Sequence, residues 1–360
     1  MNNLSIDFGS CVRVFSKNST CTFCRDICPK NAIFYNENIP VISSECIDCG
    51  GCIGVCPDEA ISLKNFNTID FIFSYLKDKN PLISCKKNIP CLALLSVENL
   101  ITLALLKDKT VLDIGHCESC DIKDPLYKQI SDNIKEANIF LSSVETDKQI
   151  AIKEIRFIDE KKDIKSLNQD RRAFLKRFTT KGTTESKIEF QNSLKRDKNS
   201  FLNQKDSENI RKKEIPDKRK LLLLALDKVE HPKNYLLFMP NELSFVSQKY
   251  IDSSCDNCSI CYRICPSGAL TSDKYGSKIF FEPTSCIKCS LCHDVCEKKS
   301  LSLISFSTKE FFEPKKYELI SFKRTRCTEC TNFFTYLGGE TICPRCKIEE
   351  EEAKNLWKIT

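Results

Sequence analysis

The stretch that decides the fold is residues 255–266, CDNCSICYRICP, followed by residues 286–296, CIKCSLCHDVC. Each run places four cysteines with two, two and three residues between them. The chain holds 24 cysteines among 360 residues, against 3 histidines and 2 methionines, and the cysteines fall into tight groups. Grouped thiols at such intervals are typical of metal ligands, whereas a disulfide scaffold suits short secreted chains. The sequence therefore predicts metal sites.

These intervals suit a cubane iron-sulfur cluster, which needs four thiolates arranged around it. One looping backbone supplies three of them, and the fourth cysteine of each run binds the neighbouring cluster. Structural zinc is the competing interpretation, but it fits two interleaved four-cysteine runs poorly. The predicted ligands of the two clusters are Cys255, Cys258, Cys261 and Cys296 for one, and Cys265, Cys286, Cys289 and Cys292 for the other.

This stretch resembles the bacterial two-cluster ferredoxin family, including the sequence PSGAL at 266–270 after the fourth cysteine. Glu297 departs from the proline that the family usually has after its last cysteine, and we expect this to alter a turn but no ligand. The resemblance implies a small α+β fold that holds two [4Fe-4S] clusters close together.

The pattern occurs again near the N-terminus. Residues 46–57, CIDCGGCIGVCP, form an intact run, whereas the run at 21–29, CTFCRDICP, has Asn18 where the pattern places a cysteine. Cys11 is the obvious replacement, and the alternative is a three-iron cluster with Cys11 merely buried. The expected ligand sets are Cys11, Cys21, Cys24 and Cys56 for one cluster, and Cys28, Cys46, Cys49 and Cys52 for the other.

A third cysteine group lies between the repeats, in residues 69–158. Apolar runs alternate there with helical patterns, which predicts strands at 81–85, 110–115 and 138–144 in a small parallel sheet. Two cysteines lie at or after the end of each of the first two strands, and such folds place ligands at that edge of the sheet. The candidate ligands are Cys85, Cys91, Cys117 and Cys120.

The order strand, cysteine, helix, strand and C-x2-C in this region resembles the delta-subunit domain of methyl-viologen-reducing hydrogenases. That resemblance implies a [2Fe-2S] cluster on a small α/β domain. A fifth [4Fe-4S] cluster, a zinc ion and a redox-active dithiol at Cys117 and Cys120 remain as alternatives. We interpret His116 as structural.

The last four cysteines form two C-x2-C pairs near the C-terminus. Gly338 and Gly339 lie between the pairs and supply the positive φ values that a hairpin needs, so the four thiols can close a tetrahedral site. The segment resembles a zinc ribbon, which implies a structural or partner-binding zinc ion, with a rubredoxin-like iron site as the alternative. The predicted ligands are Cys327, Cys330, Cys343 and Cys346.

The expected architecture is α+β and multidomain. Residues 159–235 are rich in charged and amide side chains, and their basic residues, such as those at 218–220, predict a solvated tether or a contact with an acidic partner. The five predicted parts are a ferredoxin-like 2[4Fe-4S] module at 1–68, a small four-cysteine α/β domain at 69–158, a charged linker with helical segments at 159–235, a second ferredoxin-like module at 236–315 and a zinc-ribbon-like tail at 316–360.

Charge and hydropathy limit the possible location and partners. The formal net charge is +6, but six metal sites with four thiolates each would bring the loaded protein to about −6, so a nucleic-acid partner is not indicated. The N-terminus lacks signal-peptide features, and no apolar run is long enough to span a membrane. Residues 171–176, RRAFLK, resemble a twin-arginine export motif, but they lie deep in the chain and polar residues follow them. We expect a cytoplasmic protein.

The sequence contains no glycine-rich nucleotide loop, no nucleophile-base arrangement and no open metal position. It therefore predicts a polyferredoxin-like iron-sulfur protein that passes single electrons to or from a larger redox enzyme, such as a formate dehydrogenase or hydrogenase, with no small-molecule substrate. A maturation factor, a redox sensor that binds a client enzyme, and a catalytic subunit with an open position at the middle site are the alternatives.

Overall fold

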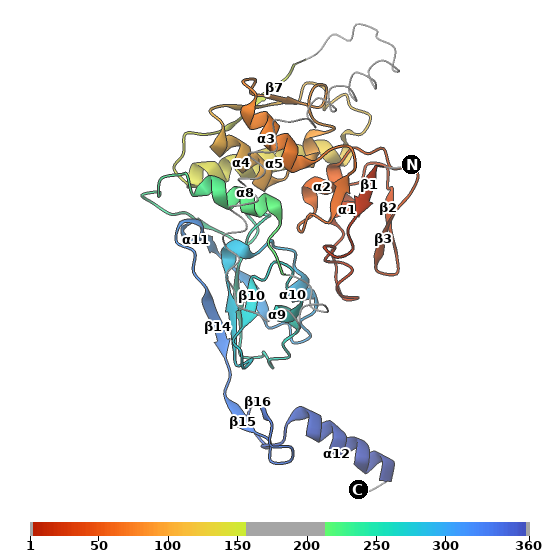
Figure 1. Ribbon diagram of the computed structural model, residues 1–360, viewed down its shortest axis with the longest axis vertical. Helices are drawn as coiled ribbons and strands as arrows, with labels where there is room; N and C mark the ends of the chain where they lie inside the picture. Colours follow the sequence, from red (N-terminus) through yellow and green to blue (C-terminus); the bar gives the residue numbers. More distant parts are fainter. Residues whose placement is uncertain (1–2, 156–212, 358–360) are drawn as a thin grey trace.

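The computed structural model describes residues 3–155 and 213–357. The part of the predicted 159–235 linker up to residue 212, with the RRAFLK motif, lies outside the described residues. Figure 1 shows the remaining parts, with the C-terminal part of the chain extending away from the others. We call these parts the first segment (residues 4–63), the middle unit (68–153), the second segment (248–304) and the tail (324–357).

The first segment contains six short elements in the order β-α-β-β-α-β. Its outer strands pair antiparallel, with Leu4 opposite Leu63, and its inner strands form an antiparallel hairpin. Each helix lies within a cysteine run, carries the third cysteine of that run and ends near the fourth. The elements are β1 (Leu4–Ile6), α1 (Phe23–Asp26), β2 (Ile33–Asn36), β3 (Ile39–Ile42), α2 (Gly51–Val55) and β4 (Ile61–Leu63).

The second segment repeats this order and this pairing. Its outer strands pair antiparallel, with Leu301 opposite Ile251, and its inner strands again form a hairpin. The repeat seen in the cysteine spacing is therefore also a repeat of structure. The elements are β9 (Gln248–Ile251), α9 (Ile260–Ile264), β10 (Leu270–Ser272), β11 (Lys278–Phe281), a 3-10 turn η2 (Pro283–Ser285), α10 (Leu291–Asp294) and β12 (Leu301–Ile304).

The middle unit has the predicted parallel sheet, with strand order β5-β6-β7. The prediction of its third strand at 138–144 is wrong, because those residues continue a long helix. Ile130, Ile134, Ala137 and Leu141 are buried at helical spacing, so a helix packs them all on one face. The elements are α3 (Thr68–Lys77), β5 (Leu82–Ser84), η1 (Leu92–Leu94), α4 (Val97–Leu106), β6 (Thr110–Asp113), α5 (Lys123–Ser143) and β7 (Ile150–Lys153).

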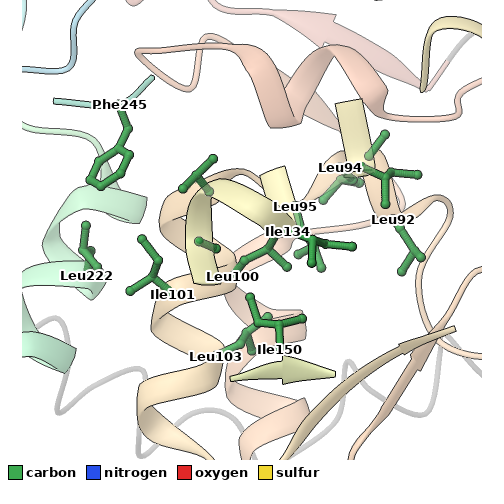
Figure 2. Close-up of a cluster of buried hydrophobic side chains, with 14 of the residues drawn as sticks. Leu92, Leu94, Leu95, Leu100, Ile101, Leu103, Ile134, Ile150, Leu222 and Phe245 are labelled. Carbon is green, nitrogen blue, oxygen red and sulfur yellow. The ribbon is translucent and has the colours of Figure 1, made fainter. Parts of the chain in front are cut away.

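Helix α8 (Asp217–Leu226) packs against α4 and joins the main core. Figure 2 shows Leu222 of α8 and Phe245 beside Ile101 of α4. The expectation that residues 218–220 are solvated is wrong for the first two, since Lys218 and Arg219 are buried. The carboxylate of Glu98 compensates the buried charge of Arg219. The charged composition of residues 159–235 did not indicate this ion pair.

Further strands connect the second segment to the core and to the tail. Strand β8 (Leu237–Phe238) pairs with β13 (Phe306–Ser307), and α11 (Lys309–Phe312) brings Phe311 against the core. Strand β14 (Tyr317–Ser321) pairs with β11, so the chain after residue 316 first extends the sheet of the second segment. The tail proper then contains β15 (Arg324–Arg326), β16 (Phe333–Thr335) and α12 (Pro344–Trp357). None of the helices in 3–155 and 213–357 is long and apolar enough to cross a membrane.

Candidate metal centres

Two cavities in the first segment are each lined by four cysteines. The space between their walls, counted with its opening, is about 420 Å³ in one and about 340 Å³ in the other. The first cavity has the thiols of Cys11, Cys21, Cys24 and Cys56, and the second has those of Cys28, Cys46, Cys49 and Cys52.

Cys11 lines the same cavity as the three cysteines with which the sequence analysis grouped it. Arg13 holds the loop of Cys11 in place. The Arg13 guanidinium donates hydrogen bonds to the carbonyl oxygens of Ser19 and Cys21, at 3.2 and 2.9 Å. It also lies over the ring of Tyr35, 3.9 Å from the ring centroid. These contacts tie the inserted residues between Cys11 and Cys21 to the wall of the cavity.

The second segment has two cavities with the same composition. Their spaces are about 540 and 310 Å³. One is lined by Cys255, Cys258, Cys261 and Cys296, and the other by Cys265, Cys286, Cys289 and Cys292. In both segments the fourth cysteine of each run therefore lies with the first three cysteines of the other run, which is the interleaving that two neighbouring clusters require.

Left-handed backbone turns bring these thiols together. In the three intact runs the residues on both sides of the second cysteine have positive φ, for example 60° at Asn257 and 70° at Ser259. The altered run around Cys24 lacks this pair. Three residues after each fourth cysteine φ is positive again: Asn31, Glu59, Gly268 and Lys299. The turn after Cys296 thus keeps the left-handed residue of the other three, and the change that we expected from Glu297 is not seen there.

Backbone and side-chain groups point at several of these sulfurs. The amide N–H groups of Ala32 and Ala60 donate to the Sγ atoms of Cys28 and Cys56, at 3.2 and 3.3 Å. The hydroxyl of Ser247 lies 3.3 Å from the Sγ of Cys286. Hydrogen bonds to thiolate sulfur stabilise negative charge and are one of the means by which proteins adjust iron-sulfur clusters.

Burial favours the protonated form of several of these thiols. It raises the pKa of Cys21 and of Cys261 to about 12, and nearby thiolates add to the effect. A metal-binding thiol must lose its proton, so filling these cavities releases protons, and the metal charge replaces them as the compensation for four thiolates. The donor set, all sulfur and mostly half-buried or buried, fits iron-sulfur clusters.

The tail cysteines are packed much more tightly. Their four sulfur atoms lie within 4.8 Å of one another, and the Sγ atoms of Cys330 and Cys343 are 3.7 Å apart. Four sulfurs at about 2.3 Å from a tetrahedral zinc ion would be about 3.8 Å apart. Across 3–155 and 213–357, no other set of three or more potential ligand atoms is this close. The tail therefore fits a single ion, and the other cysteine groups are spaced more widely.

The middle group lies at the carboxyl edge of the parallel sheet, as the sequence predicted. Cys85 directly follows β5, and Cys117 follows β6 after a turn in which the carboxylate of Asp113 accepts the amide N–H of Gly115. Burial, together with the charges of Cys85 and Cys120, raises the pKa of Cys117 to about 12. The same causes apply to Cys91, with Cys49 of the first segment among its charged neighbours.

Buried cations lie beside some of the cysteines. Lys249 lines the cavity of Cys286 and its three partners, and it is 3% exposed. Lys218 donates to the carbonyl oxygen of Cys56. Sequence reasoning missed both residues, although the alternation along β9 carried a signal: Lys249 and Ile251 share the buried face, while Tyr250 points outward.

Comparison with known protein families agrees with this geometry in the second segment. Residues 254–301 match the 4Fe-4S dicluster domain family. The matched stretch includes all eight cysteines of the two cavities in the second segment, which supports iron-sulfur clusters of the [4Fe-4S] type there. It covers well under half of the chain.

Three curated relatives are similar over short stretches. An uncharacterised ferredoxin of Methanocaldococcus jannaschii is 46% identical over 43 residues, which are 12% of this chain and 28% of the relative. An uncharacterised polyferredoxin-like protein of the same organism is 40% identical over 52 residues, 14% of this chain and 31% of the relative. A ferredoxin of Rickettsia felis is 38% identical over 52 residues, 14% of this chain and 48% of the relative. The chain thus spans less than half the length of each.

Proposed function

We propose that this chain is an iron-sulfur electron-transfer protein that holds four [4Fe-4S] clusters, two in each segment. The observation that carries the proposal is the set of four cavities, each lined by four cysteines in the interleaved arrangement. The names of the relatives, ferredoxin and polyferredoxin-like, support the same function. Such clusters supply one-electron chemistry, and the residues of this chain bind them, exclude water and set the surrounding charge.

We further propose an iron-sulfur cluster at the middle group. Its four cysteines lie at the edge of the sheet where such folds bind ligands. Among the described residues, no three of these sulfurs lie within 4.8 Å of one another. This wider spacing favours a cluster over a single zinc ion. For the tail, the 3.7 Å sulfur separation favours zinc, which carries no electrons and would stabilise the fold of the tail or a partner contact.

The partner in this proposal is a larger redox enzyme, such as a formate dehydrogenase or a hydrogenase. Its support is indirect: the proposed clusters exchange single electrons, so the chain needs a partner protein that supplies or accepts them. Cys120 and Cys258 are exposed, so the middle group and one cavity of the second segment are accessible to a docked protein.

Electron paramagnetic resonance of the anaerobic protein tests the proposal. Reduction with dithionite is expected to bleach the visible absorption and to produce reduced [4Fe-4S] signals, and both changes should reverse on oxidation. A variant with Cys343→Ser and Cys346→Ser is the matched control, because it removes two thiols of the tail and should leave the signals unchanged. Loss of the signals in that control, or their absence in the unaltered protein, would contradict the proposal.

A further inference from the structure

The first and second segments meet at a small apolar cluster. Val12 of the first segment is buried with Leu291 and Val295 of the second, and Leu291 is 0% exposed. The side chains of Cys21 and Cys289 both pack against this cluster, one from each segment. Val12 also lines the Cys21 cavity, so the cluster links that cavity to the second segment through Cys289, and Val295 lines the Cys258 cavity beyond it.

Hydrogen bonds reinforce this junction. The backbone N–H of Thr20 donates to Oδ2 of Asp294 at 2.8 Å, and its hydroxyl donates to Oδ1 at 2.9 Å. Asp294 is the last residue of α10, two residues before Cys296. Each segment thus contributes a residue within two positions of its cysteines, so these hydrogen bonds hold one set of thiols in position relative to the other.

The first segment contacts the middle unit near its other set of cysteines, Cys28, Cys46, Cys49 and Cys52. Helix α2, which carries Cys52, packs against η1, which begins after Cys91. The approach is close: a Cβ atom at Gly54 would lie 2.1 Å from the carbonyl oxygen of Ala93, so only glycine fits there. The charge of Cys49 also contributes to the raised pKa of Cys91.

We propose that the five cysteine groups form one continuous row through the molecule, with the Val12–Leu291–Val295 cluster as the bridge between the two segments. The order runs from the middle group to the Cys49 cavity, the Cys21 cavity, the Cys289 cavity and the Cys258 cavity. This inference rests on the proposed function and adds an order, a junction and two ends to it.

The ends of the row differ from its interior in exposure. Cys120 of the middle group and Cys258 are the exposed thiols of the five groups, whereas the thiols of the two cavities at the junction are buried or half-buried. A one-electron donor protein at one end would be oxidised and a one-electron acceptor at the other would be reduced. The exchange makes no bond and moves no proton.

Magnetic interaction across the junction tests the row. A variant with Cys46→Ser, Cys49→Ser, Cys255→Ser and Cys258→Ser disables the outer cavity of each segment and leaves the two at the junction. Its reduced form is expected to show electron paramagnetic resonance signals broadened by spin coupling. Iron bound in both remaining cavities with two independent signals would overturn the row and leave the proposed function intact. If neither the unaltered protein nor any variant binds iron, both the row and the proposed function are overturned.

A second pair of variants keeps the cysteines intact. Asp294→Ala removes the two hydrogen bonds across the junction, and Asp26→Ala is its control, since Asp26 also ends a short helix two residues before a fourth cysteine but bonds only within its own segment. We expect Asp294→Ala to weaken the spin coupling between the segments and to increase proteolytic cleavage between them, and Asp26→Ala to change neither. Equal behaviour of the two variants would overturn the assigned junction.

Discussion

Lys249 illustrates how one residue can adjust one cluster among several. Its ammonium group is buried in a cavity wall, 2.9 Å from Nε2 of His293, and it takes part in no ion pair among the described residues. Burial lowers its pKa, but the thiolates of Cys292 and its neighbours outweigh burial and raise the pKa above the ordinary value. A buried cation without a carboxylate partner is costly unless a negative group lies near it. A cluster with four thiolates would be that group.

We predict that Lys249→Met lowers the reduction potential of the cluster at Cys265, Cys286, Cys289 and Cys292 and leaves the others nearly unchanged. The physical reason is that a nearby positive charge stabilises the added electron. A potentiometric titration followed by electron paramagnetic resonance measures the shift. Lys274→Met, an exposed lysine next to Tyr275, is the control. An equal shift of all clusters, or none, would contradict the role of Lys249.

Residue-level reading of the sequence identified the thiols but not their charged neighbours. Cysteine spacing is a local property, so the four-residue groups, including Cys11, could be nominated without a structure. The buried positions of Lys218 and Arg219 depend on contacts with Glu98, which lies 120 or more residues away in the chain. Such pairing leaves no local pattern, and the charged composition around these residues pointed instead to a solvated tether.

Helix α8 is the element that joins the three cysteine-rich parts. Arg219, which is 0% exposed, donates to Glu98 of the middle unit at 2.6 Å and also to the carbonyl oxygens of Thr284, Cys286 and Phe245. In the first segment, the carboxylate of Glu59 accepts the backbone N–H of Asp217 at 2.6 Å. One turn of α8 thus contacts the first segment, the middle unit and the second segment.

We predict that Arg219→Met destabilises the protein by about 3–5 kcal/mol, because it leaves Glu98 as a buried charge with only Lys218 nearby. Denaturant unfolding under anaerobic conditions measures the free energy of unfolding. Lys228→Met, at an exposed position just after α8, is the control and should change it by less than about 1 kcal/mol. If the two variants lost the same stability, α8 would not be the joining element.

At the level of elements, the parallel sheet could be predicted but its last strand could not. The run NIFLSSV at 138–144 is apolar and short, which suits either a strand or the end of a helix. Burial of Phe140 between Phe245 and Phe311, with ring centroids 5.6 and 5.5 Å away, decides for the helix. Both rings come from beyond residue 240, so the deciding contact was invisible to local reasoning.

For the whole molecule, the arrangement of the five groups depends on contacts that the sequence alone did not reveal. Repeats of one fold need not touch, and the Val12 cluster and the Gly54 approach are what place the first segment between the other two. The tail differs, because it follows β14, contacts the second segment through the hydrogen bond from Asn257 to Thr335, and then extends away from it (Figure 1). The molecule therefore combines a joined set of cysteine cavities with a separate single-ion site.

The most direct test of the central claim is the content of iron, acid-labile sulfide and zinc per chain in protein purified without oxygen. We predict about sixteen iron and sixteen sulfide from four [4Fe-4S] clusters, about two or four more of each from the middle group, and about one zinc from the tail. Iron near zero, together with several zinc ions per chain, would contradict the claim and would indicate a zinc-stabilised protein instead.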